Sequence, residues 1–293
     1  MEIIMKCDLK YGNKKIKFEF DSGTCIGILK PVQDAATVNE KEIVEKALQK
    51  PVKSKKIEKF VKPKDRVLIV VPDKTRLSRL NIVLPIVLQK LENIGVKDEN
   101  IKFIFANGSH GAQTEEEKRA ILGKEIIKKY QVLEHDAFDF ANHLYFGKTP
   151  KGTHVYLNKF TDRSEKIITI GSVTHHYFAG FGGGAKMIMP GLAYYKTIEQ
   201  NHKRSLSKKP GINRNCKSGT LKNNPIYEDI IQVIRMCPPI YSICLMLNEK
   251  GAIASVSGGD PLISHLNITE KVNEKYRIKI DTASDLVICS AGG

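Results

Sequence analysis

An alternation of apolar strands with helix-forming segments constrains the fold of this chain more than any other feature. Arg66–Val71 (RVLIVV) is an apolar run of buried-strand length, and Ile101–Ala106 (IKFIFA) is a second one. Between them, Asn81–Gly95 has apolar residues at helical spacing and ends on a glycine, as helices often do. Strands alternating with helices are typical of a parallel sheet, so we expect an α/β, Rossmann-like domain with a mainly parallel sheet.

Further elements are expected on both sides of this unit. Residues 1–30 predict a short β meander, Glu40–Leu48 predicts a helix, and Pro51–Asp65 reads as a basic linker. Thr114–Leu122 begins with TEEE, in which Thr114 and Glu117 form a capping box. Other strands are expected at Gln131–His135, Ile167–Ile170, Tyr241–Asn248 and Ala252–Ser257, and other helices at Thr197–Leu206, Pro225–Met236 and Ser264–Tyr276.

The two ends of the chain suggest its domain organisation. We expect a catalytic and cofactor-binding domain over residues 1–262, followed by the beginning of a second α/β domain over residues 263–293. The last segment, DLVICSAGG, reads as a buried strand followed by two glycines, which normally lead into a loop and helix. We therefore expect the second domain to be truncated. The N-terminus has no signal-peptide pattern, and no window approaches 18 apolar residues.

Composition excludes several classes of protein. The formal net charge is +15, but the lysines are scattered rather than interleaved with aromatic residues, so we expect no nucleic-acid partner. A solvated basic surface with some attraction for anionic substrates is the simpler interpretation. No two of the six cysteines have the spacing of a zinc knuckle or redox motif, so a reduced, cytoplasmic setting fits best.

Three polar loops follow predicted strands. They are Pro72–Arg79 (PDKTRLSR), Asn107–Gln113 (NGSHGAQ) and the glycine-rich stretch Thr174–Gly191. In parallel sheets the reactive loops lie beyond the carboxyl ends of the strands, so we expect these three to meet at one edge.

The first two loops carry candidates for binding and proton transfer. Arg76 is suited to clamp a carboxylate or phosphate through two parallel hydrogen bonds, with Asp73 beside it. His110 has the side chain best suited to general acid–base work near neutral pH. The simpler alternatives are a helix cap with a surface arginine, and a solvated loop histidine.

The glycine-rich stretch carries the strongest signal. Gly182, Gly183 and Gly184 allow backbone amides to approach a phosphate or a flat cofactor, and Lys186 is suited to pair with phosphate or act as a nucleophile. The spacing matches neither a P-loop nor a dinucleotide motif. His175 and His176 point to opposite sides if the chain is extended, so only one enters a site. A flexible loop is the simpler alternative.

The other histidines are not equally suited to a functional role. His202 lies on a predicted helix, and a neutral imidazole there is suited to bind nickel, zinc or copper. The remaining four have no partner spacing and read as structural or exposed: His135, His143, His154 and His265.

Taken together, these motifs resemble the lactate racemase family, whose members use a nickel-pincer nucleotide. The likeness covers nearly the whole chain, and the HYFAGFGGGAK block with a histidine sixteen residues after its lysine is highly specific. The matching stretches are Pro72–Arg76, Ala106–His110, Gly171–Gly191, Lys196–His202 and Ser290–Gly293.

The resemblance implies a racemase or epimerase of a small 2-hydroxy acid, lactate or a relative, acting by hydride abstraction and return through that cofactor. Its partners would be the substrate and the enzymes that make the cofactor. The roles it implies are covalent attachment of the cofactor as a thioamide at Lys186, nickel ligation by His202, acid–base catalysis by His110 and His176, binding of the substrate carboxylate by Arg76, and cofactor contact by Asp73.

The chain departs from the family pattern at Leu77 and Gly111, which we interpret as changes in substrate shape. The chain ends at Gly293, and family members continue with a domain that closes over the site, so we expect weak cofactor binding and slow or absent turnover. Two other functions fit the residues: a non-catalytic mononucleotide- or phosphate-binding module, and a zinc-dependent hydrolase with three protein ligands.

Overall fold

The chain divides into two units, a larger one over residues 33–274 and a smaller one over residues 1–32 and 275–293. The computed structural model describes residues 4–12, 14–23, 25–29, 39–207 and 211–290. The domain boundary expected after residue 262 falls inside helix α9 (Pro261–Tyr276).

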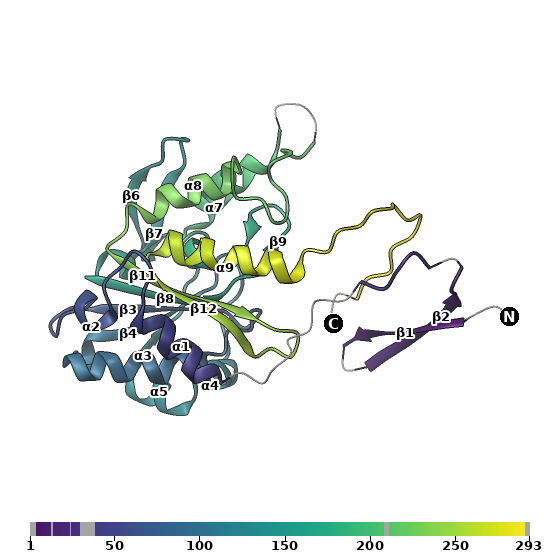
Figure 1. Cartoon of the computed structure of the whole chain (residues 1–293). Helices are drawn as coiled ribbons and strands as arrows, with labels where there is room; N and C mark the ends of the chain where they lie inside the picture. The colour runs from purple at the N-terminus through teal and green to yellow at the C-terminus, as the bar shows by residue number, and fades with distance from the viewer. Residues whose placement is uncertain (1–3, 13, 24, 30–38, 208–210, 291–293) are drawn as a thin grey trace. The chain divides into compact units, whose positions relative to one another are not determined.

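A six-stranded sheet forms the centre of the larger unit (Figure 1). Its strand order is β12-β11-β8-β3-β4-β5, and every neighbouring pair is parallel except β11 with β12. The expected α/β fold with a mainly parallel sheet is therefore confirmed. The strands are β3 (Val67–Pro72), β4 (Ile101–Ala106), β5 (Gln131–Leu133), β8 (Lys166–Ser172), β11 (Ile240–Leu247) and β12 (Ile253–Gly259).

The central strand β3 explains where a site can form. All six of its residues are buried, as its uninterrupted apolar sequence predicts for a strand covered on both faces. β3 pairs with β4 on one side and with β8 on the other, and the chain reverses its direction of strand addition between them. In open parallel sheets such a reversal leaves a crevice outside the carboxyl ends of the two strands.

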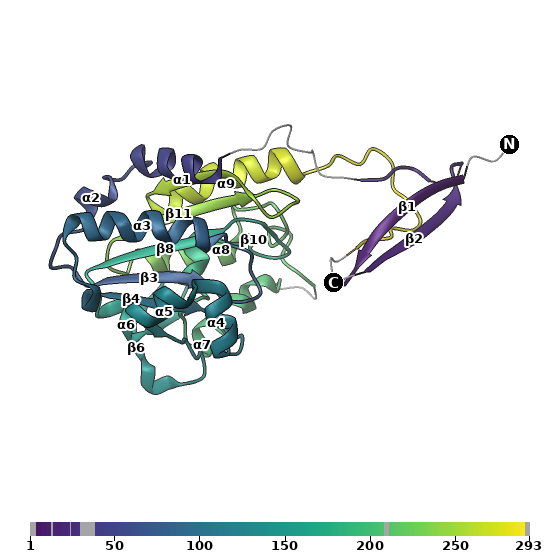
Figure 2. The same cartoon turned by 90° about the horizontal axis from the view of Figure 1, so that it is seen from below.

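Helices cover both faces of the sheet (Figure 2). One apolar core lies between the sheet and α1 to α5, and the other between the sheet and α7, α8, the 3₁₀ turn η3 and strand β7. The helices are α1 (Glu40–Gln49), α2 (Ile57–Phe60), α3 (Leu80–Ile94), α4 (Glu115–Leu122), α5 (Lys124–Lys129), α6 (Lys159–Asp162), α7 (Tyr195–His202) and α8 (Pro225–Ile234). The 3₁₀ turns are η1 (Asp98–Asn100), η2 (Phe140–Asn142), η3 (Gly184–Met187) and η4 (Lys203–Ser205).

Local signals account for most of these boundaries. The predicted capping box is present, because Thr114 accepts from the Glu117 backbone and the Glu117 side chain accepts from the Thr114 backbone. The expected linker Pro51–Asp65 instead contains the short helix α2, whose Ile57 is fully buried in the first core. Within the described residues, no helix has both the length and the apolarity needed to cross a membrane.

The described part of the larger unit also contains two short antiparallel pairs outside the main sheet. One pairs β6 (His143–Lys148) with β7 (His154–Asn158), and it was not predicted from the sequence. The other pairs β9 (His175–His176) with β10 (Gly180–Phe181) inside the glycine-rich stretch.

The smaller unit contains an antiparallel ribbon of β1 (Ile4–Tyr11) and β2 (Lys14–Asp21), so the N-terminal prediction of β structure is confirmed. The prediction of a buried strand after Asp285 is wrong for the described residues up to Ser290, which form no strand. Leu286 and Val287 are largely exposed there, because an apolar run becomes a strand only when a neighbouring strand pairs with it. Residues 291–293 lie outside the described part.

Candidate active site

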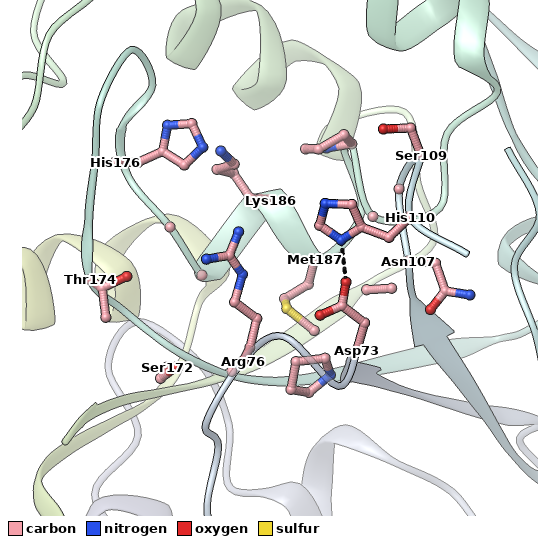
Figure 3. Close-up of a pocket in the computed structure, with 18 of the residues that line it drawn as sticks. Asp73, Arg76, Asn107, Ser109, His110, Ser172, Thr174, His176, Lys186 and Met187 are labelled. Atoms are coloured by element: carbon pink, nitrogen blue, oxygen red, sulfur yellow. Dashed lines mark hydrogen bonds and ion pairs between the residues drawn. The ribbon is translucent and has the colours of Figure 1, made fainter. Parts of the chain in front are cut away.

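A cavity of about 400 Å³ opens at the carboxyl ends of β3, β4 and β8 (Figure 3). Its lining comes from all three loops that the sequence singled out, together with α7, so the expected convergence is confirmed. The size is within the range of small-molecule and cofactor sites. The predicted site residues that line it are Asp73, Arg76, His110, His176, Gly182, Gly183, Lys186 and His202, whereas Gly184 is buried and does not line it.

His110 is held by a buried carboxylate. Its Nδ1 lies 2.5 Å from Oδ2 of Asp73, whose side chain is only 4% exposed. The other oxygen of Asp73 accepts from the backbone and hydroxyl of Thr75. Because a carboxylate accepts, Nδ1 of His110 carries a proton, so in the neutral ring the lone pair lies on Nε2. The sequence did not predict this pair, and the cofactor contact assigned to Asp73 stays a prediction.

His176 is the histidine of its pair that enters the cavity, as the alternation of an extended chain predicts. His175 points away and contacts Asn273 of α9 through Nε2, at 2.9 Å. Nδ1 of His176 accepts from the backbone N–H of Ala179 at 3.3 Å, so the proton of the neutral ring lies on Nε2. His110 and His176 are therefore held in opposite tautomers.

The glycine-rich loop brings Lys186 to the cavity on the 3₁₀ turn η3. Gly183 precedes this turn with φ of +71°, and a Cβ there would lie 2.6 Å from the Ser172 carbonyl oxygen. The backbone N–H of Lys186 donates to the Gly183 carbonyl at 3.1 Å. A larger residue at position 183 would therefore push the lysine away from strand β8.

His202 is the last residue of α7. Its Nδ1 donates to the Ile198 carbonyl at 2.9 Å, which leaves the Nε2 lone pair available.

Phe178, which sequence reasoning did not single out, connects three of the predicted side chains. Its ring makes edge contacts with the rings of His176 and His202, at centroid distances of 4.6 and 4.9 Å. The Lys186 amine lies 5.6 Å from the centre of the same ring. The only signal in the sequence was its place between His176 and the glycines, where an aromatic residue is equally typical of a core.

The cavity disfavours extra positive charge. Burial, and then the Arg76 guanidinium, lower the pKa of Lys186 to about 7. Burial, followed by Lys186, Arg76 and His202, lowers the pKa of His176 to about 3. Burial and then Lys186 lower the pKa of His202 to about 4. Near pH 7 the two histidines are thus neutral, and Lys186 has a large fraction of nucleophilic free amine.

Burial of neutral histidines makes the fold sensitive to acid. His135 and His265 are each about 1% exposed, and burial is the main cause that lowers the pKa of each to about 4. An unfolded histidine takes up its proton near pH 6.5. Between about pH 6.5 and 4 the unfolded chain therefore binds more protons, so stability falls as pH falls through this window.

We predict that His135→Gln weakens this dependence by about 1.4 kcal/mol per pH unit. The measurement is urea unfolding at pH 7 and pH 5, compared with the exposed histidine variant His154→Gln. Equal pH dependence in wild type and His135→Gln would contradict the prediction.

The described residues contain no group of three or more His, Cys, Asp or Glu side chains arranged to hold a metal ion. The zinc-dependent hydrolase needs three such ligands, so the described part of the chain gives it no support.

Comparison with solved structures supports the fold. The structure is similar to the lactate racemase apoprotein from Thermoanaerobacterium thermosaccharolyticum, with a TM-score of 0.83 and 26% identity, over 92% of this chain and 63% of that one. A crystal structure of a protein from Thermotoga maritima matches with a TM-score of 0.62 and 18% identity, over 81% of this chain and 58% of that one. The second likeness concerns the fold alone.

Sequence comparison identifies the family. The chain is 29% identical over 288 residues to lactate racemase from Thermoanaerobacterium thermosaccharolyticum. It is 31% identical over 291 residues to lactate racemase from Lactiplantibacillus plantarum. Each match covers 98% of this chain, which spans 66% of the length of either relative. Residues 11–213 match the lactate racemase N-terminal domain, and this chain belongs to that family.

Proposed function

We propose that this chain interconverts the stereoisomers of a small 2-hydroxy acid, such as lactate. One observation carries the proposal: two histidines held in opposite tautomers line the same cavity as an arginine that points into it (Figure 3). In the neutral ring, Nε2 of His110 has a lone pair that can accept the hydroxyl proton, and the Nε2–H of His176 can donate a hydrogen bond to the substrate oxygen. Inverting a hydroxyl-bearing carbon moves its hydroxyl between two sides of the substrate, so a polar side chain is needed on each side.

Arg76 supplies the anchor for the substrate. Its guanidinium presents parallel N–H donors that match a carboxylate, and the surrounding cavity has two neutral histidines and a lysine rather than a competing anion. Asp73 is the carboxylate nearest the site, but both of its oxygens are engaged by His110 and Thr75. The Arg76 guanidinium therefore selects an anionic substrate and fixes its reacting carbon near the histidines.

The cavity residues fit the nickel-pincer nucleotide that the family resemblance implies. Lys186 offers a partly neutral amine for a thioamide bond, His202 offers Nε2 as a nickel ligand, and the backbone of Gly182 and Gly183 forms part of the wall. When bound, this group supplies a place for the hydride of the substrate. The protein positions the substrate, moves the hydroxyl proton and excludes water. The enzymes that make the cofactor are then required partners.

The test is to express the natural gene with the cofactor-making enzymes and follow both enantiomers of several 2-hydroxy acids by chiral chromatography. We expect interconversion, bound nickel and a mass increment on Lys186. His110→Asn and His176→Asn should each lose about 10²–10⁴-fold in rate while retaining nickel. His202→Ala should lose nickel and keep the fold. Nickel-loaded protein that binds a mononucleotide but converts none of the acids would overturn the proposal and favour the non-catalytic module.

A further inference from the structure

His265 is a buried histidine that the family motifs do not include. It lies on α9, is about 1% exposed, and its Nε2 is 2.9 Å from the carbonyl oxygen of Gly182. Since a carbonyl only accepts, Nε2 carries the proton and donates it. Nδ1 then faces the Tyr227 hydroxyl of α8 at 3.5 Å. The His265 ring thus connects α8 and α9 to the glycine-rich loop.

The ring and the loop also interlock sterically. Gly184 has φ of +53°, and a Cβ at this position would lie 2.6 Å from the His265 ring. The loop carbonyl that accepts from His265 and the glycine that lies against its ring are two residues apart. Gly182 and Gly184 come four and two residues before Lys186. The backbone N–H of Lys186 donates to the carbonyl of Gly183, which lies between them.

We propose that His265 is a positioning residue that fixes the glycine-rich loop and, through it, the Lys186 amine. A loop with three consecutive glycines has high conformational freedom, which must be restricted from outside if its lysine is to have one position. The hydrogen bond from His265 to the Gly182 carbonyl restricts the backbone before Gly183. The packing of Gly184 against the His265 ring restricts the backbone after it. An apolar residue of similar size would fill the space under the loop but would leave the Gly182 carbonyl without its donor.

The consequence for catalysis rests on the proposed function, while the effect on the loop does not. Fixing Lys186 sets where a group attached to its amine meets Arg76 and the two catalytic histidines. Small displacements of a reacting group lower the rate without weakening substrate binding. His265 therefore acts on turnover through the loop, without touching the substrate.

Hydrogen exchange of the cofactor-free full chain tests the loop directly. In His265→Leu, amides of residues 182–187 should exchange about fivefold to tenfold faster, with β3 and β8 unchanged. His265→Gln retains an N–H donor and should restore slow exchange. Gly184→Ala displaces the same ring and should loosen the loop as His265→Leu does. His143→Leu is the matched control, because His143 is also buried and bonded to a carbonyl, that of Asp139, in another turn.

Unchanged exchange at residues 182–187 in both His265→Leu and Gly184→Ala would overturn the proposal. So would an equal increase in β3 and β8, or an equal effect of His143→Leu on the loop. In cofactor-loaded enzyme, His265→Leu should lower kcat about tenfold at constant KM. A loosened loop with unchanged kcat would overturn the link to Lys186. An inactive wild type with an ordered loop would overturn the proposed function alone.

Discussion

Asp73→Asn is expected to lower turnover by about 10²–10⁴-fold while leaving the fold intact. Asp73 accepts the Nδ1 proton of His110 and thereby keeps the Nε2 lone pair in the cavity. An asparagine that donates its amide N–H to Nδ1 would move the ring proton to Nε2. The imidazole would then be in the wrong tautomer to accept the hydroxyl proton. The Oδ1 of asparagine can still accept from Thr75, so the loop keeps its turn.

The measurement is the rate of interconversion of both enantiomers by cofactor-loaded enzyme, together with nickel content and the thermal midpoint. Glu117→Gln is the matched control, because it removes the exposed ion pair with Lys74 in the same loop without touching His110. Rates of Asp73→Asn within about threefold of this control would contradict the role given to Asp73, since general base catalysis is worth far more.

Local sequence was sufficient to predict the strands of the main sheet and the longer helices. The apolar run of β3 and the helical spacing of α3 each have one stable arrangement in a parallel sheet, so their positions follow from residue type. The carboxyl ends of such strands lie at one edge, which is why the convergence of the three loops was also predictable. Where an element depends on a distant partner, local sequence was insufficient. Asp285–Ser290 is as apolar as a strand but forms none in the structure, and the lysine-rich linker contains the buried Ile57.

In the candidate site, too, some features were predictable from local sequence and others depend on distant partners. Histidines, arginine and lysine were identified by chemical type, because few side chains transfer protons or bind carboxylates. Their partners were not identifiable, since 37 positions separate Asp73 from His110 and 83 separate Gly182 from His265. A lone histidine has the same appearance in a sequence whether it is exposed, like His154, or buried beneath a reactive loop, like His265. Only the fold distinguishes the two.

The second large effect concerns stability rather than chemistry. Asp229 of α8 is completely buried and accepts hydrogen bonds from four side chains. Thr149 donates to Oδ1 at 2.6 Å, and the donors to Oδ2 are Thr153, Asn201 and Arg204, at 2.7, 3.0 and 3.2 Å. They come from the turn between β6 and β7, from α7 and from η4. One carboxylate therefore holds three segments against α8.

Asp229→Ala should lower the free energy of unfolding by about 3–5 kcal/mol, because it removes the anionic partner of the partly buried Arg204 and one acceptor from each of three other polar side chains. Urea unfolding at pH 7 measures this loss. Glu228→Gln, one residue earlier on the same helix, is the matched control. It removes only the half-exposed ion pair with Lys151, so a change of about 0–1 kcal/mol is expected. A difference between the two variants below about 1 kcal/mol would show that the network contributes little. Asn201, which donates to Asp229, directly precedes His202 at the end of α7. Asp229→Ala should therefore also weaken nickel retention in protein that is still folded. This loss would distinguish disorder at the end of α7 from global unfolding.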